Sequence, residues 1–271
     1  MSDTKNILFI LTDQQRFDSV GWDPNCSLAT PNLDRIAEGT VFLDCTTVNP
    51  LCTPARCALL TGRYAHQVNM RTMSGELSAA YPTVPRALQE AGYRTSLVGK
   101  THWWQGWDWF DWTPSAHYDM RGLRKELMSY GFDQVWEVTD KRALGINKND
   151  MTSYLDEQKT NDYRDEYNQF YTSITGATFR IEDTVQEKWG TFPFPEEDHP
   201  ESIVTDKAIA EIEQAASTQT PFALFTHYFA PHDPLDPPQR FLDQVPYEEV
   251  DDFVTRPGQT PLTPEQKKQL W

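Results

Sequence analysis

Residues 6–12 read Asn-Ile-Leu-Phe-Ile-Leu-Thr, and this stretch decides the fold class. Its unbroken apolar run predicts a strand that is buried on both faces, as strands in parallel sheets are. Further strands are predicted over 41–48, 94–98 and 222–228. Helices alternate with them: one opens at Thr30-Pro31 and closes at Gly39, and one opens at Thr53-Pro54 and closes at Gly62. Two more helices are predicted over 84–91 and 202–216. This alternation indicates an α/β sheet.

The composition limits the classes of protein to which the chain can belong. Its 271 residues suffice for one large domain or two small ones, and 38% hydrophobic residues can bury a core. A formal charge of −16 argues against nucleic acid and against an anionic membrane as partners. An anionic substrate would therefore need a locally basic pocket inside an acidic protein.

The chain has no apolar run long enough to be a transmembrane helix. Its start is polar and the apolar run at 7–11 is too short for a signal peptide, so we expect a cytoplasmic protein, or a periplasmic one if a leader has been removed. The 4 cysteines could form two disulfides, but free thiols are expected in a reducing compartment.

Residues 52–56 read Cys-Thr-Pro-Ala-Arg and are followed by Leu-Thr-Gly-Arg at 60–63. Cys52 lies just before a predicted helix, whose free N–H groups and dipole favour an anion. Arg56 follows about one turn later, where its fixed charge can hold anionic oxygens. Read alone, Cys52 also fits a buried structural cysteine.

Polar residues follow the other predicted strands. Asp13 and Gln14 end the first strand, and their carboxylate and amide oxygens suit a hard divalent cation. Lys100 and His102, in the run Gly-Lys-Thr-His at 99–102, follow the strand at 94–98. Because ligands of α/β sheets bind outside the carboxyl ends of strands, these residues are expected to meet at one site.

A histidine after the last predicted strand completes the set. Residues 230–234 read Ala-Pro-His-Asp-Pro and carry His232, whereas His227 falls within the strand itself. We therefore assign the functional role to His232 and interpret His227 as a core histidine. Arg56, Lys100 and the histidines would concentrate positive charge at one point of an acidic protein.

Together these stretches resemble the formylglycine-dependent sulfatases, which share Cys-x-Pro-x-Arg with a downstream Thr-Gly-Arg, Gly-Lys-x-His and Pro-His-x-Pro. The resemblance implies an alkaline-phosphatase-like α/β sandwich with a largely parallel mixed sheet between helices. It also implies hydrolysis of sulfate esters, with a sulfated carbohydrate as the expected substrate. In that family a separate maturation enzyme oxidises the cysteine to formylglycine.

The resemblance assigns the residue roles. Cys52, Arg56, Lys100, His102 and His232 are the expected catalytic residues. An aldehyde at residue 52 hydrates to a gem-diol; one hydroxyl attacks sulfur, and loss of the proton of the second hydroxyl expels sulfate and restores the aldehyde. The resemblance also implies one divalent cation, Ca²⁺ before Mn²⁺, Mg²⁺ or Zn²⁺, held by Asp13, Gln14 and the side chain at residue 52.

Two alternative functions stay open. The Asp-Gln pair at 13–14 occurs in some sulfatases and also in related phosphonate monoester and phosphodiester hydrolases, so it widens the range of substrates. A truncated, non-catalytic fragment is the other reading. Residues 263–266 (Thr-Pro-Glu-Gln) resemble a helix start, yet the chain stops at Trp271 without a C-cap.

The second metal pair and the small C-terminal domain of the family have no counterpart in the sequence. Residues 1–271 are therefore expected to be the N-terminal catalytic portion, with the missing portion or a second copy as a partner. Within it, residues 103–200 predict an irregular, acidic and aromatic insertion with some helix. Its tryptophans either stack on a sugar or a quaternary ammonium or pack on the core: Trp103, Trp104, Trp107, Trp109 and Trp112.

Overall fold

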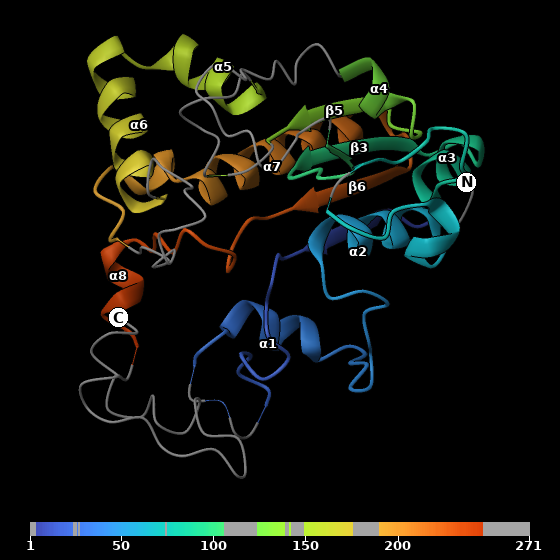
Figure 1. The fold of residues 1–271 in the computed structure, drawn as a ribbon, viewed down its shortest axis with the longest axis horizontal. Coiled ribbons are helices and arrows are strands. Elements are labelled where there is room, and N and C mark those ends of the chain that lie inside the picture. Colours follow the sequence, from blue (N-terminus) through green and yellow to red (C-terminus); the bar gives the residue numbers. More distant parts are fainter. Residues whose placement is uncertain are drawn as a thin grey trace.

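The computed structural model describes residues 4–23, 26, 28–73, 75–105, 124–138, 141, 149–175 and 190–245. Its centre is a 4-stranded sheet in the order β1-β6-β3-β5, formed by Ile7–Leu11, Phe222–His227, Arg94–Gly99 and Gln134–Glu137. Every neighbouring pair in this sheet is parallel (Figure 1). The carboxyl ends of all these strands therefore lie along one edge of the sheet.

Eight α-helices are labelled along the described chain. They are α1 (Pro31–Ala37), α2 (Cys52–Thr61), α3 (Val84–Glu90), α4 (Arg124–Met128), α5 (Asp150–Gln158), α6 (Asn161–Thr175), α7 (Pro200–Thr218) and α8 (Gln239–Leu242). Two 3₁₀ turns cover Ala65–Val68 and Glu196–Asp198, and a separate antiparallel pair joins β2 (Gly75–Glu76) to β4 (Trp104–Gln105). The predicted helices after Pro31 and Pro54 and those over 84–91 and 202–216 are confirmed.

The sheet separates two hydrophobic cores, because alternate residues of a strand point to opposite faces. Val98 and Leu224 belong to the core that holds α7, α5 and α6. Their strand neighbours Leu97 and Phe225 belong to the other core, which includes Cys57 of α2. In Figure 1, α7 runs along one side of the sheet and α2 lies on the other. The expected sheet between helices is therefore present.

The first strand is less buried than the sequence predicts. Among the described strands, β1 pairs only with β6 and forms one edge of the sheet. Ile7 and Phe9 pack on the α2 core, but Leu8 is 49% and Ile10 is 47% exposed. The prediction of burial on both faces is wrong here because β1 is an edge strand and α7 packs on β6 and β3.

Two other predictions differ from the structure. Residues 41–48 form an exposed loop instead of a strand, and Phe42 is 76% exposed. Strand propensity is realised only where a partner strand is present, and none pairs with this segment in the described chain. Conversely, residues 103–200 contain more regular structure than expected, because β5 joins the central sheet and Tyr167 and Tyr171 of α6 are buried in the core.

Within the tryptophan cluster, Trp103 is a core residue. It is 1% exposed and stacks on Phe132 with ring centroids 5.8 Å apart. The packing interpretation is therefore correct for this residue. Trp104 lies in β4, whereas Trp107, Trp109 and Trp112 and the predicted helix start at 263–266 lie outside the described residues. None of the described helices is both long and apolar enough to span a membrane.

Candidate active site

The carboxyl edge of the sheet brings most of the predicted site residues together. Asp13 follows β1, Lys100 follows β3, and the loop after β6 carries His232. β1, β6 and β3 are neighbours, so these residues converge although they are far apart in the sequence. Arg56 reaches the same place from α2, where it is 5% exposed.

A buried ionic cluster forms the centre of the site. The Lys100 Nζ lies 2.7 Å from Asp13 Oδ2, and the Arg56 Nη2 lies 3.2 Å from the same oxygen. Burial raises the pKa of Asp13, but the positive charges of Lys100 and Arg56 outweigh it and lower the pKa overall. One carboxylate therefore faces two cations, which leaves a net positive charge for an anion.

His227 and the main chain fix the position of Arg56. The carbonyl oxygen of Lys100 accepts a hydrogen bond from Arg56 Nη1 at 3.0 Å and lies 2.9 Å from His227 Nδ1. Burial and the charge of Arg56 lower the pKa of His227 to about 3, so this histidine is neutral at pH 7. Its ring also meets Trp103 edge-on, with centroids 5.8 Å apart. His227 is thus buried in the core, as the sequence predicted.

Cys52 is the first residue of α2, whereas the sequence predicted that it lies just before a helix opened by Thr53-Pro54. Its thiol is half-buried and hydrogen-bonds with Met73 Sδ at 3.8 Å, and the side chain of His232 also acts on it. Burial raises its pKa, but the hydrogen bond with His232 and the charge of Lys100 lower it overall. By contrast, burial raises the pKa of Cys57, on the core side of the same helix, to about 12. The environment of Cys52 therefore favours the thiolate, whereas that of Cys57 disfavours it.

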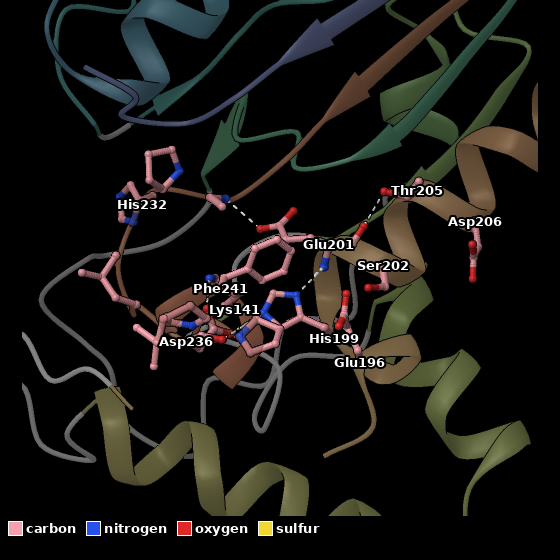
Figure 2. Close-up of a pocket in the computed structure, with 16 residues that line it drawn as sticks. Lys141, Glu196, His199, Glu201, Ser202, Thr205, Asp206, His232, Asp236 and Phe241 are labelled. Carbon is pink, nitrogen blue, oxygen red and sulfur yellow. Dashed lines mark hydrogen bonds and ion pairs between the residues drawn. The ribbon is translucent and has the colours of Figure 1, made fainter. Parts of the chain in front are cut away.

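The loop that carries His232 is held at its start by Glu201, which the sequence analysis missed. From the first turn of α7, the Glu201 carboxylate accepts a hydrogen bond from the main-chain N–H group of Ala230 at 2.7 Å (Figure 2). It accepts a second one from the main-chain N–H group of Phe229 at 3.3 Å. His232 Nδ1 lies 2.7 Å from the carbonyl oxygen of Asp233. Glu201 follows Pro200 at a helix start, so its sequence context indicates only a favourable helix charge.

A second buried group holds the far end of the same loop. Asp236 forms an ion pair with Lys141 and accepts a hydrogen bond from the Tyr171 hydroxyl at 2.7 Å. Lys141 also donates to the carbonyl oxygen of Pro234 at 3.0 Å. Burial raises the pKa of Asp236, but His199 and Lys141 outweigh it and lower the pKa to about 2. No sequence motif links these residues, and only the fold brings them together.

The remaining predicted residues have unusual backbone conformations. His102 is 4% exposed and has φ 58°, and Gln14 has φ 62° with an exposed side chain. Both values lie in the left-handed region, which side chains other than glycine rarely adopt and which is enriched at functional sites.

The described residues do not by themselves provide a complete cation site. They contain no cluster of three or more His, Cys, Asp and Glu side chains suited to a metal ion. Asp13 is already ion-paired with Lys100 and Arg56, and a divalent cation beside this oxygen would meet both positive charges. Ca²⁺ takes about six to eight oxygen ligands, so further ligands would be required.

Comparison with known proteins identifies the family. The fold is of the alkaline-phosphatase-like type, and Lys100 and Arg56 meet Asp13 at the carboxyl edge of its parallel sheet. The family model Sulfatase matches residues 5–253, so the chain belongs to the sulfatase family.

Individual relatives agree with this assignment. The chain is 27% identical over 254 residues to an arylsulfatase of Clostridium perfringens, covering 90% of this chain and 47% of that protein. It is 32% identical over 133 residues to an N-acetylglucosamine-6-O-sulfatase of Bacteroides thetaiotaomicron, covering 49% of this chain and 23% of the relative. The chain therefore spans less than half the length of these relatives.

A solved structure supports the fold. The phosphonate monoester hydrolase from Silicibacter pomeroyi superimposes with a TM-score of 0.59 at 24% sequence identity. The match covers 95% of this chain and 46% of that one. At this level of identity the likeness establishes the alkaline-phosphatase-like fold and leaves the substrate open.

Proposed function

We propose that the protein hydrolyses sulfate esters, with a sulfated carbohydrate as the substrate, through a nucleophile made from Cys52. The observation that carries this proposal is the convergence of Cys52, His232, Lys100 and Arg56 at one edge of the sheet. Their net positive charge solves the problem of binding an anion in a protein of formal charge −16. Membership of the sulfatase family supports the reaction class.

The environment of residue 52 fits the formylglycine of the family. A formylglycine made there by a maturation enzyme would supply a hydrated aldehyde as the nucleophile. Its place at the start of α2 puts free main-chain N–H groups beside the sulfate. His232 contacts the residue-52 side chain and so is positioned to move a proton there.

The cations of the site would stabilise charge on the sulfate. Lys100 and Arg56 are buried at 0% and 5% exposure, and this low-dielectric setting strengthens their attraction for anionic oxygens. Arg56 is fixed by its hydrogen bond to the Lys100 carbonyl, so the guanidinium needs little reorganisation when substrate binds. We assign His102 to protonation of the leaving oxygen, because it follows Lys100 on the same buried loop.

We also propose that Asp13, Gln14 and residue 52 contribute to a divalent-cation site, with Ca²⁺ as the first candidate. The family generally uses such an ion, which supports the proposal. The described residues offer too few ligands to complete the site, so no catalytic step is assigned to a metal.

A phosphonate monoester or phosphodiester hydrolase is the second candidate. One observation favours it, the amide of Gln14 beside Asp13, and the fold shared with a phosphonate monoester hydrolase is compatible with it. A panel that compares 4-nitrophenyl sulfate with a phenyl phosphonate ester, using metal-supplemented protein with residue 52 matured, separates the two. We expect the higher kcat/KM for the sulfate; a higher value for the phosphonate would overturn the first proposal. Sulfate binding without any turnover would favour a non-catalytic protein.

A further inference from the structure

A cavity of about 600 Å³ opens beside His232. It lies between the start of α7, the loop that carries His232, and α8 (Figure 2). Its volume falls within the range of pockets that bind small organic molecules. His232 belongs both to this wall and to the cluster around Cys52, so the cavity adjoins the proposed reaction centre.

We propose that this cavity binds the organic part of the substrate and that it takes an uncharged, hydroxylated ring, such as a neutral sugar. The inference rests on the proposed function, because it assigns the cavity to the alcohol that sulfate-ester hydrolysis releases. It adds a location for that alcohol and a restriction on its charge.

The chemistry of the walls supports a ring with both apolar and polar faces. Pro231, Leu235, Pro237 and Phe241 supply apolar surface from the loop and from α8. Ser202 and other residues of the first two turns of α7 supply polar groups on the opposite wall (Figure 2). Apolar surface with a few polar groups that fix orientation is the usual composition of a small-molecule site.

The charges of the walls exclude an anion. Four carboxylates line the cavity: Glu196, Glu201, Asp206 and Asp236; Glu196 is ion-paired with Arg240, which is not a lining residue, so Glu201 and Asp206 carry the argument. Among the described lining residues, the one Lys or Arg is Lys141, and it is already ion-paired with Asp236. A second sulfate or a uronate carboxylate in this cavity would meet like charges without an available cation, which is unfavourable.

The site is therefore polarised across His232. On one side Lys100 and Arg56 outnumber the carboxylate of Asp13, and on the other side carboxylates predominate. This arrangement orients a substrate that carries a single sulfate, because only the end with the sulfate is attracted to the cationic side. A substrate with anionic groups at both ends has no favourable orientation.

The test uses a cavity-filling variant and a matched control. Ser202→Phe places a ring in the cavity, and Ser217→Phe makes the same change on an exposed position of the same helix. Substrates are the 6-sulfates of glucose, galactose and N-acetylglucosamine, each compared with the matching 3,6-disulfate. We expect Ser202→Phe to lower kcat/KM for the preferred monosulfate at least about tenfold, with Ser217→Phe near wild type. We expect wild-type protein to use the disulfate at least about tenfold less efficiently.

A binding measurement distinguishes failure of this inference from failure of the proposed function. Saturation-transfer NMR with the sulfate-free methyl glycosides needs neither a matured residue 52 nor turnover. Glycoside binding that Ser202→Phe abolishes and Ser217→Phe retains supports the cavity even in a protein that hydrolyses no sulfate ester. Hydrolysis that is equal in wild type and Ser202→Phe, or equal for monosulfate and disulfate, overturns the inference and leaves the proposed function standing.

Discussion

Glu201 offers a test of how the catalytic loop is positioned. In Glu201→Gln one carboxylate oxygen becomes an NH₂ group, so either Ala230 or Phe229 loses the acceptor of its main-chain N–H. A buried N–H without a partner costs about 1–3 kcal/mol. Burial raises the pKa of Glu201, so the ionised carboxylate carries a desolvation cost that glutamine lacks. The two effects oppose, and we expect the free energy of unfolding to fall by no more than about 2 kcal/mol.

The effect on turnover should be larger than the effect on stability. The two N–H groups lie just before His232, so relaxation of the loop displaces its ring, and a displacement of about 1 Å can cost roughly 10²-fold in rate. We expect kcat/KM for a sulfate ester to fall at least about tenfold in Glu201→Gln and further in Glu201→Ala.

Steady-state kinetics and thermal unfolding of the same samples provide the measurement. Glu213→Gln, an exposed position on α7, is the control. Wild-type kcat/KM in folded Glu201→Ala would refute the idea that this carboxylate positions the loop.

Three further predictions address the site and its support. Lys100→Ala, His102→Ala and His232→Ala should each lower kcat roughly 10²–10³-fold, measured with a sulfate ester; near-wild-type kinetics in His232→Ala would point to His227 instead. Asp236→Asn should lower the free energy of unfolding by about 2 kcal/mol at pH 7, because the folded-state pKa of Asp236 is lowered from 3.8 to about 2. That stabilisation is present above pH 3.8 and is lost as the pH falls towards 2. Denaturant titrations should therefore show the free energies of unfolding of wild type and variant converging near pH 2. A difference that stays constant with pH would contradict a stabilising role for the ionised Asp236 carboxylate. Chelation should lower activity and added Ca²⁺ should restore it, whereas full activity after exhaustive chelation would remove the metal proposal.

Local patterns predicted the elements that hold the site. The predicted strands at 94–98 and 222–228 became β3 and β6, and Lys100 and His232 follow them as expected. This worked because ligands of α/β sheets bind outside the carboxyl ends of the strands, so residues that follow parallel strands meet at one edge.

Features that depend on long-range packing could not be predicted. Exposure of Leu8 and Ile10 follows from the edge position of β1, and strand order is not a local property. Lys141 and Asp236 are 95 positions apart, and Glu201 reaches the main chain at Phe229 and Ala230 from a different element. Neither arrangement leaves a signal in the neighbouring sequence.

The central claim is that the nucleophile is made from Cys52. Mass spectrometry of the tryptic peptide that contains residue 52, with an aldehyde-reactive probe, tests it after co-expression with a formylglycine-generating enzyme. The run Cys-Thr-Pro-Ala-Arg at 52–56 is intact, so we expect conversion to formylglycine and labelling by the probe at residue 52 alone. An unmodified thiol at residue 52, under conditions that convert a control sulfatase, would contradict the account.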